Sequence, residues 1–569
     1  MKINPLELSQ ARAARAAIER LYIEMRHLFN SGLHRHDSMA GQVLTEALLT
    51  LSPEIYGSMG DPEKVELDGL VYVMDRLPKG IEECRLVKLI SEEGYKESDF
   101  EVITPYARRR NCYRIDAEQM FVEVTRGRSE IYDVLTHLTF MYIEAEKIKE
   151  HVLNEDGETS FEWQKLASIV AGEATLTDKN VETAFAYLST ILGRTFAETQ
   201  QAHARLKAHD NTNNGLFHIV YWLGKIAIEE ELEGRTRARE VSFSPTLRER
   251  IGHHIYGERW ASQIKSFLKN EKLLDRPIHI ISANLHSVMN SLYAYPALRK
   301  TLGKKVSIIE LATQLSVEEN SRLRRRVEKY ASEHGMTVLE DSFGTNISVQ
   351  IIDTEKIQWD KATPELSLPK DLKKKQSPVI IVMDYAFGEQ AYETMDELLK
   401  PINEVAKKER NMNVASINIM GKAGILHGGK GDIMVPTAHV FEGTADNYPF
   451  KNDLTLDDFK DGEIDAYDGA MITVLGTSLQ NRYVLAYFQQ SSWNAVGLEM
   501  EGAHYQKAIQ AAACIRQSIR PDVTLRYAYY ASDNPLLTGS TLASGSLGMV
   551  GVKPTYLITL KMLEKILNS

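Results

Sequence analysis

Val379-Ile-Ile-Val-Met383 decides the fold class of the C-terminal half, because five apolar residues, four of them β-branched, stand between Pro378 and Asp384. A run of this length and composition, bounded by turn residues, predicts a strand that is buried on both faces. Similar runs occupy Ile278–Ile281, Val306–Ile309, Val349–Ile352, Val414–Met420, Met471–Leu475 and Leu525–Tyr530, and helical segments separate them. We therefore predict that residues 275–569 form an α/β domain with a twisted, mostly parallel sheet flanked by helices.

Residues 1–274 have a different pattern. Apolar side chains recur there at spacings of three and four residues, as in Ala14, Ile18, Leu21 and Met25. This periodicity is typical of amphipathic helices, so we predict an all-α domain of roughly ten helices. A short alternating piece near Phe100–Ile103 is the one segment predicted to be extended. The role of this domain is not predicted.

Composition narrows the function classes. The 569 residues are 43% hydrophobic and 25% charged, which is the composition of a globular protein. The net charge of −11, without a long basic run, argues against binding to nucleic acid or to an anionic membrane. Three widely separated cysteines, no apolar leader and no apolar stretch of about 18 residues predict a cytoplasmic protein without disulfides.

The first candidate site is Glu499-Met500-Glu501, at the end of a predicted strand and before a helix that begins with Gly502. Ligands bind at the carboxyl ends of strands in open α/β sheets. Two carboxylates can accept hydrogen bonds from a vicinal diol, while the methionine packs on a sugar ring. The alternative is that both glutamates only stabilise the N-terminus of the helix.

The second candidate is Ser532-Asp533, which ends the apolar strand 525–530. A carboxyl group at this position is partly desolvated, which raises its pKa toward that of a general acid. An Asx-type turn before Pro535 is the alternative.

The third candidate is a glycine-rich segment that follows strand 414–420 and contains Gly421, Lys422, Ala423 and Gly424. Glycines at this point would form a loop that lets backbone N–H groups approach an anion or a sugar oxygen. A plain chain reversal into the next strand, Asp432–Val435, is the alternative.

These three motifs, taken in order, resemble the nucleoside phosphorylase and nucleosidase superfamily, which contains purine nucleoside phosphorylases, methylthioadenosine nucleosidases and AMP nucleosidases. The resemblance covers residues 278–569. The matching pieces are Asp384–Ala391 with Gly388, Gly421–Gly424, Gly431–Met434, Glu499–Glu501 and Ser532-Asp533. The continuation Asp533–Leu536 is most similar to the AMP nucleosidases.

The resemblance implies a phosphorylase-like sheet and a role for each motif. Glu501 would bind the ribose 2′- and 3′-hydroxyls, and Met500 would pack against the sugar. Asp533, next to Ser532, would protonate N7 of a purine as the glycosidic bond breaks. Glu499 and the residues Gly421–Gly424 would also contact the substrate.

The chain departs from the family pattern at several positions. Lys422 stands where relatives carry a small or polar residue, and an ammonium group there can bind phosphate. Leu479 stands near the position of the usual base-stacking aromatic residue. The first strand lacks the acidic residue of the nucleosidases and the arginine of the phosphorylases, so Asn284 or His286 is the candidate substitute.

A metal site is not predicted. His34-Arg-His36-Asp37 is the most suggestive cluster, but it lacks a further ligand at helical spacing. We expect no cofactor.

The predicted function is hydrolysis of the base–ribose bond of a purine nucleoside or nucleotide. A purine nucleoside phosphorylase is the second hypothesis, and a non-catalytic nucleoside-binding protein is the third. The expected partner is therefore a small molecule, not a nucleic acid or a membrane.

The resemblance also implies self-association, because relatives complete their sugar sites with residues from a neighbouring subunit. We expect a homodimer, or a hexamer built from dimers. Sedimentation velocity at micromolar concentration should detect it, and a single species of 64.3 kDa would contradict this prediction.

Overall fold

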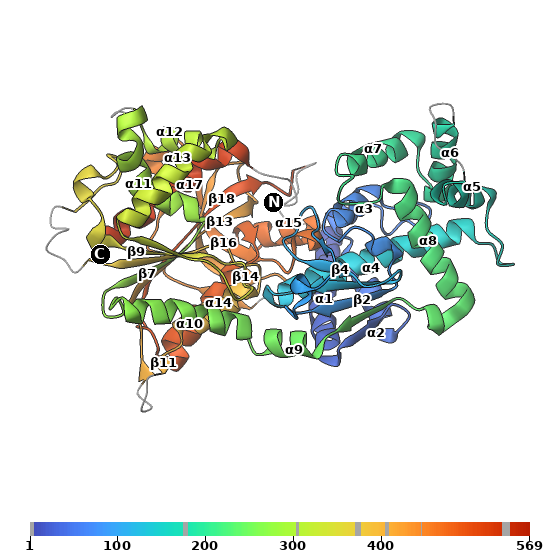
Figure 1. Cartoon of the computed structure of the whole chain (residues 1–569), viewed down its shortest axis with the longest axis horizontal. Helices are drawn as coiled ribbons and strands as arrows, with labels where there is room; N and C mark the ends of the chain where they lie inside the picture. The colour runs from blue at the N-terminus through green and yellow to red at the C-terminus, as the bar shows by residue number, and fades with distance from the viewer. Residues whose placement is uncertain are drawn as a thin grey trace. The chain divides into compact units, whose positions relative to one another are not determined.

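The computed structural model describes residues 5–173, 180–302, 306–369, 377–403, 409–444, 446–537 and 547–569 (Figure 1). Its contacts divide the chain into two compact units. The N-terminal unit extends to His253 and also includes Ser478–Val484, and the C-terminal unit contains His254–Thr477 and Leu485–Ser569. Within the described ranges, no helix has both the length and the apolar composition needed to cross a bilayer.

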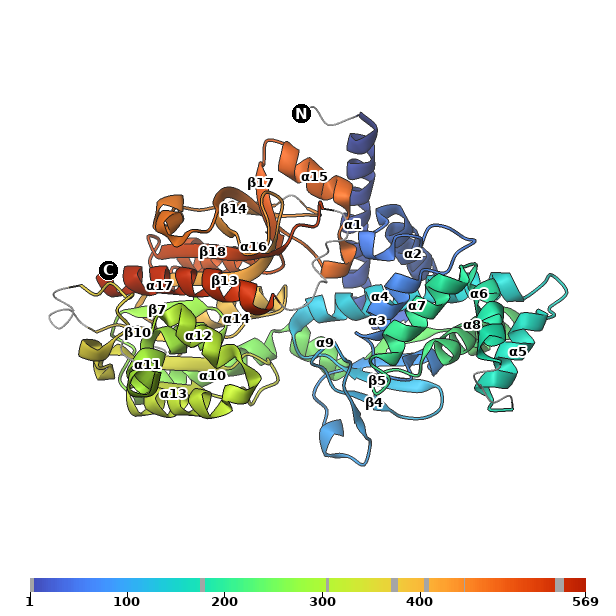
Figure 2. The same ribbon diagram turned by 90° about the horizontal axis from the view of Figure 1, so that it is seen from above.

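The N-terminal unit contains the predicted helices, and α5 to α8 lie together within it (Figure 2). Its helices are α1 (Pro5–Ser31), α2 (Met39–Leu51), α3 (Leu67–Met74), α4 (Gly127–Val152), α5 (Phe161–Val170), α6 (Val181–Leu192), α7 (Phe196–Lys207), α8 (Leu216–Glu233) and α9 (Pro245–Gly252). Its strands are β1 (Leu33–Arg35), β2 (Leu86–Ile90), β3 (Val102–Ile103), β4 (Cys112–Arg114), β5 (Gln119–Glu123) and β6 (Glu240–Phe243).

The all-α prediction for this unit is therefore only partly confirmed, because the unit is largely helical but also contains a sheet. The six strands form one sheet in the order β1-β6-β2-β5-β4-β3, with β6, β2 and β5 parallel to one another. Each strand has only two to five residues, and runs of that length cannot be distinguished from buried helix by periodicity alone. Of these strands, only β3 lies within the segment that was predicted to be extended.

The C-terminal unit is built on a ten-stranded sheet that, among the described residues, mixes parallel and antiparallel neighbours. The main path runs β15-β14-β16-β17-β13-β7-β10-β9-β8, and β18 pairs with β13 and β14. The strands are β7 (Ile278–Ser282), β8 (Met336–Leu339), β9 (Val349–Asp353), β10 (Val379–Met383), β13 (Val414–Ile425), β14 (Ile433–Phe441), β15 (Asn447–Pro449), β16 (Ala466–Thr473), β17 (Ala495–Glu499) and β18 (Thr524–Asp533); a separate pair is β11 (Ile402–Asn403) with β12 (Glu409–Arg410).

The prediction of a mostly parallel sheet is thus only partly confirmed. Strand β13 is parallel to β7 and β18, but it is antiparallel to β17. Strand β9 is likewise antiparallel to β10. An apolar run indicates burial on two faces and contains no information about the direction of its neighbour.

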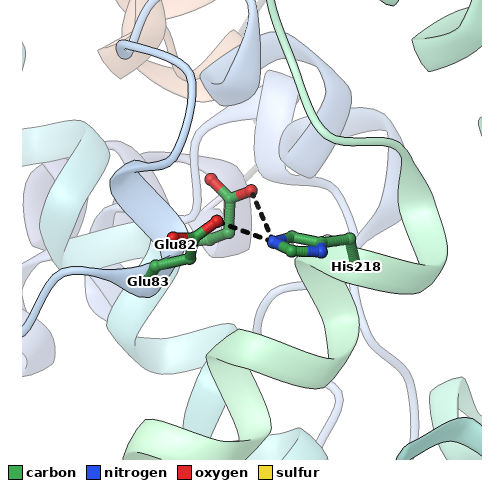
Figure 3. Close-up of side chains that lie close together, drawn as sticks. All are labelled: Glu82, Glu83 and His218. Carbon is green, nitrogen blue, oxygen red and sulfur yellow. Dashed lines mark hydrogen bonds and ion pairs between the residues drawn. The ribbon is translucent and has the colours of Figure 1, made fainter. Parts of the chain in front are cut away.

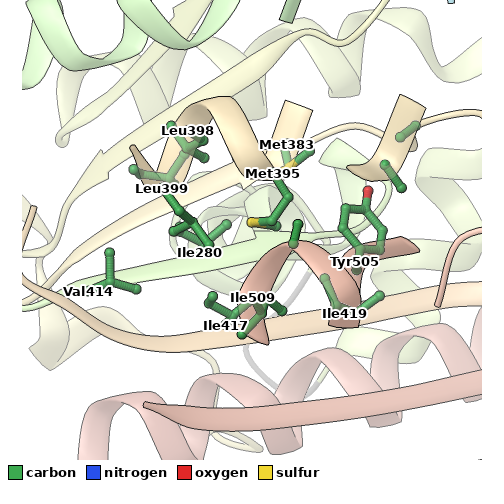
Figure 4. Packing of buried hydrophobic residues seen from close by; sticks show 14 of the residues in the cluster. Ile280, Met383, Met395, Leu398, Leu399, Val414, Ile417, Ile419, Tyr505 and Ile509 are labelled. Atoms are coloured by element: carbon green, nitrogen blue, oxygen red, sulfur yellow. The ribbon is translucent and has the colours of Figure 1, made fainter. Parts of the chain in front are cut away.

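Helices cover both faces of this sheet (Figure 1). They are α10 (Ile255–Asn270), α11 (Leu285–Leu302), α12 (Ile308–Ser316), α13 (Ser321–Glu333), α14 (Gln390–Leu399), α16 (Gly502–Gln510) and α17 (Val552–Asn568). A further helix, α15 (Arg482–Gln490), begins in the segment that belongs by its contacts to the N-terminal unit. Successive residues of β10 face opposite cores: Ile381 and Met383 share one core with α10, α14 and α16, whereas Ile380 and Val382 share the other with α11 and α17. Figure 4 shows Met383 together with residues of α14 and α16. The run Val379–Met383 is therefore buried on both faces, as predicted.

The division between the units falls near His253, earlier than the predicted boundary at residue 275. Helix α10 explains the difference, because its apolar face belongs to the core of the C-terminal sheet. Trp260 is 1% exposed and donates a hydrogen bond from Nε1 to the carbonyl oxygen of Ile347 at 2.9 Å. Helical periodicity assigned α10 to the helical half, but its packing partners are in the sheet.

The predicted strand Val306–Ile309 is instead the start of helix α12. Ser307 and Glu310 form a capping box: the Glu310 N–H donates to Ser307 Oγ at 3.1 Å, and the Ser307 N–H donates to Glu310 Oε2 at 2.8 Å. These reciprocal bonds satisfy donors at the helix start and outweigh the β-propensity of the two isoleucines.

Gly497 offers a test of the sheet next to the candidate site. It lies in β17 between β13 and β16, and an added Cβ would be 2.6 Å from the Gly424 carbonyl oxygen and would also meet Met434 Sδ. We expect Gly497→Ala to destabilise the protein by about 1–3 kcal/mol, the usual cost of overpacking. Chemical denaturation measures the change.

The matched control is Gly429→Ala, because an added Cβ at that position meets no atom within 4 Å. A loss of stability in the control that equals the loss in Gly497→Ala would contradict this account of the sheet.

Candidate functional site

The junction between β17 and α16 is built around the Glu499 carboxylate, which is 4% exposed. Its Oε1 accepts a hydrogen bond from Thr473 Oγ1 at 2.5 Å, and its Oε2 accepts from the Glu501 N–H at 2.5 Å and from the Gly502 N–H. Thr473 Oγ1 in turn accepts the N–H of Ala503 at 3.0 Å. Glu499 therefore satisfies donors at the start of α16 and fixes the position of the residues that follow it.

Glu501 lies at the N-cap of α16, and its Oε1 accepts the backbone N–H of Gly388 at 2.8 Å. Burial and the neighbouring negative charge of Glu499 raise the pKa of Glu501 to about 8. Burial also raises the pKa of Glu499 to about 7, even though Thr473 and two N–H groups stabilise its charged form. The charge of Glu499 thus opposes the ionisation of Glu501 near neutral pH.

Gly388 belongs to this arrangement through its backbone. It lies between β10 and α14 with a φ of 55°, in the left-handed region that favours glycine. This turn directs the Gly388 N–H at Glu501, so the segment predicted around Gly388 and the segment 499–501 meet in the structure.

Asp533 is the last residue of β18 and is fully buried. Its Oδ1 accepts a hydrogen bond from Ser532 Oγ, which also contacts the carbonyl oxygen of Ala423 at 3.0 Å. Its Oδ2 is buried and has no hydrogen-bond partner among the described residues. Burial raises the pKa of Asp533, and the hydrogen bond from Ser532 and the charges of Lys422 and Lys430 act in the opposite direction.

Gly424 lies between the strand that ends in Glu499 and the strand that ends in Asp533. In β13 it is opposite Leu498 of β17 on one side and opposite Asp533 of β18 on the other. Two strand spacings, about 10 Å, therefore separate the backbone next to Glu499 from that of Asp533. A distance of this order matches the span of a base with its sugar.

The glycine-rich segment is not the loop that the sequence predicted. Gly421, Lys422, Ala423 and Gly424 are part of β13, in register with residues 529–533 of β18. An added Cβ on Gly421 would be 3.3 Å from the ring of Tyr529, so the glycine here makes room for an aromatic neighbour. The chain reversal comes later, between Ile425 and Ile433.

Asn284 and His286 lie just after β7. Asn284 Oδ1 accepts the N–H of Ser287 at 2.8 Å, as an N-cap does for a helix, and His286 is exposed. The Tyr385 hydroxyl, after the end of β10, interacts with both Asn284 and Tyr530. Asn284 is therefore linked to β18 through an aromatic side chain.

Leu479 is 2% exposed and lies in the segment Ser478–Val484, which belongs by its contacts to the N-terminal unit. Met500, between the two glutamates, is partly exposed.

Sequence reasoning missed several residues of this site. Thr473 was included only as a member of an apolar run, although a hydroxyl at the end of such a run is a signal for a polar contact. His439 was also missed: its Nε2 lies 3.2 Å from the Tyr529 hydroxyl, and burial lowers the pKa of His439 to about 3. Its partner residue is about ninety positions away in the chain, so spacing contains no signal for the pair.

The described residues contain one group of three side chains able to hold a metal ion, Glu82, Glu83 and His218 of the N-terminal unit. It contains no residue of the predicted site.

The raised pKa values of Glu499 and Glu501 predict how the stability of the fold depends on pH. A carboxyl whose pKa is higher in the folded than in the unfolded state stabilises the fold below its unfolded pKa, and this contribution is lost as the pH rises through the folded pKa. For Glu499 and Glu501 the loss extends from about pH 4.5 to about pH 8. We expect the melting temperature to fall over this range, and Glu501→Gln to melt above the wild type near pH 9.

The control is Glu328→Gln, at an exposed glutamate of the same unit. A difference of about 1–2 °C corresponds to 1 kcal/mol for a unit of about 300 residues. If Glu501→Gln and Glu328→Gln melt alike at every pH, the buried carboxyl pair does not limit stability.

No curated protein matches this chain. Similar solved structures include the 5′-methylthioadenosine/S-adenosyl homocysteine nucleosidase of Campylobacter jejuni, with 11% identity, a TM-score of 0.30 and coverage of 52% of this chain and 100% of that chain. They also include a futalosine hydrolase mutant of Helicobacter pylori, with 12% identity, a TM-score of 0.29 and coverage of 51% and 99%.

Identities and TM-scores this low transfer neither a family nor an activity to this chain. Residues 42–314 and 311–568 match the model described as "Family of unknown function (DUF6909)". The two matches together cover most of the chain, which therefore belongs to this family of unknown function.

Proposed function

We propose that the C-terminal unit is an N-glycosidase that hydrolyses the bond between a purine base and the ribose of a nucleoside or nucleotide. The observation that carries this proposal is the placement of Glu501 and Asp533 on opposite sides of β13, at the same edge of the sheet. Cleavage of a purine N-glycoside leaves positive charge on the sugar and negative charge on the base. One carboxyl group on each side of β13 provides stabilisation at both ends of that charge separation.

Asp533 would act as the general acid. Its raised pKa favours the protonated form, and the buried Oδ2 has no protein partner among the described residues to compete for the proton. Ser532 holds Oδ1 and so fixes the orientation of the carboxyl group. The proton would pass from Oδ2 to N7 of the base as the electron pair of the glycosidic bond moves onto the ring.

Glu501 would bind the ribose 2′- and 3′-hydroxyls, which donate hydrogen bonds to its carboxylate. The ionised form is the better acceptor and also stabilises the positive charge that develops on the sugar. Glu499 would act as a positioning residue, because protein donors already occupy both of its oxygens. Met500, partly exposed between them, is placed to pack on the sugar ring.

Phosphorolysis is the second candidate, and the lysines near Asp533 favour it. Lys422 and Lys430 are both exposed, and their positive charges act on Asp533. An ammonium group at this edge of the sheet can hold inorganic phosphate as the nucleophile in place of water. Release of ribose 1-phosphate instead of free ribose would identify this reaction.

Asp533→Asn and Glu501→Gln should have different kinetic effects. We expect Asp533→Asn to lower kcat by about 10²–10⁴-fold with little change in substrate binding, because the amide cannot donate an acidic proton. Glu501→Gln should weaken binding and turnover together, since the diol contact exists in both the ground state and the transition state. Steady-state kinetics with circular dichroism as a folding control distinguishes the two effects.

The assay is incubation with a panel of purine nucleosides and nucleotides, with and without phosphate, followed by chromatography for free base. Base release by the wild type that persists undiminished in Asp533→Asn would exclude Asp533 as the acid. A ligand-dependent rise in melting temperature without base release from any member of the panel would instead indicate a non-catalytic nucleoside-binding protein.

A further inference from the structure

Glu82, Glu83 and His218 come together in the N-terminal unit, although they are far apart in the sequence (Figure 3). The two glutamates end the 3-10 turn η2 (Ile81–Glu83), and His218 is in the first turn of α8. The imidazole points toward both carboxylates in Figure 3. One oxygen from each carboxylate and Nε2 of the imidazole all lie within 4.8 Å of one another.

The distances suit a bound ion. His218 Nε2 is 2.7 Å from Glu83 Oε1 and 4.0 Å from Glu82 Oε1. Two ligands at about 2.1 Å from a tetrahedral metal ion are about 3.4 Å apart. A movement of less than about 1 Å in each pair would therefore give metal-bonding distances.

The burial of Glu82 is the second observation. Its side chain is 2% exposed, and Nε2 of the His218 imidazole lies 4.0 Å from its Oε1. Arg114 Nη2 donates a hydrogen bond to Glu83 Oε2 at 2.8 Å, which is not the oxygen of Glu83 that faces His218. Burial of a carboxylate is costly unless a cation or hydrogen bonds compensate it. Asn214 donates one hydrogen bond to Glu82 Oε1, and a divalent ion between the two glutamates would add further compensation.

Asn214 completes the group. Its side-chain amide contacts the same two oxygens that face His218, Glu82 Oε1 at 2.8 Å and Glu83 Oε1 at 3.3 Å. The amide has an oxygen at one end and a nitrogen at the other, so a half-turn about its last bond exchanges a donor for a metal ligand. The adjacent Asn213, 5% exposed, holds this segment by donating to the carbonyl oxygens of Leu206 and His209.

We propose that Glu82, Glu83 and His218, with the amide oxygen of Asn214, bind one divalent first-row transition metal ion in the N-terminal unit. A ligand set of three oxygens and one imidazole nitrogen fits Zn²⁺ or Mn²⁺ better than Mg²⁺ or Ca²⁺. The ion would join η2 to α8. This site is independent of the proposed glycosidase site and departs from the expectation that the chain holds no metal.

The test is isothermal titration of the metal-free, tag-free full chain with Zn²⁺ and with Mn²⁺. We expect one equivalent to bind, and Glu82→Gln and His218→Ala to weaken binding by at least about 10–100-fold, the scale of loss seen when even an outer-shell partner is removed. The matched control is His209→Ala. His209 is paired with Asp75 at 3.1 Å, and both histidine side chains are 30% exposed.

Asn214→Asp separates a metal site from a simple hydrogen-bond network. With a metal, a third carboxylate is a better ligand than an amide, so the variant should bind at least as tightly as the wild type and gain more melting temperature on metal addition. Without one, three carboxylates would repel one another and added metal would not rescue stability. Absence of binding by the wild type, equal binding by Glu82→Gln, or lost binding in Asn214→Asp would overturn the proposal.

Discussion

The backbone pairing of β13 with β17 on one side and β18 on the other is the constraint on which the C-terminal unit depends. Gly424 is opposite both Leu498 and Asp533, and this shared register determines how far the acidic residues at the two strand ends lie from each other. Gly497 permits the pairing because its neighbours leave no room for a Cβ. A shift of one residue in this register would turn every side chain of the shifted strand to the other face of the sheet and would separate the acidic residues of the site.

Desolvation gives the residues at this edge their chemical character. Glu499 is buried but hydrogen-bonded through both oxygens, so its role is to hold α16 in place. Asp533 is buried, and no described residue donates a hydrogen bond to its Oδ2, which favours its protonated form. Two acidic residues of the same sheet edge are thus suited to different tasks because their partners differ, not because their chemistry does.

The N-terminal unit illustrates how burial and sequence distance interact. Its sheet is assembled from short strands that are up to about two hundred residues apart, such as β1 and β6, which pair through His34 and Val241. The cluster of Glu82, Glu83 and His218 arises in the same way, from a turn and a helix that only the tertiary fold brings together. The spacing of residues in the sequence predicts neither this sheet nor this cluster, since both depend on which surfaces the chain buries against each other.

The sequence by itself determined several buried strands of the C-terminal half, because runs such as 379–383 are apolar enough that only a position between two helix layers can bury them. The run 306–309, which begins a helix, was the exception. It also indicated Glu501, at the N-cap of a helix, and Asp533, at the end of a strand, since local pattern can locate both elements. Only the tertiary structure decided that Gly421–Gly424 continue a strand, that α10 packs on the sheet, and that Glu499 is engaged by Thr473. The physical reason is that register, packing partners and hydrogen-bond partners are long-range properties, whereas periodicity and propensity are local ones.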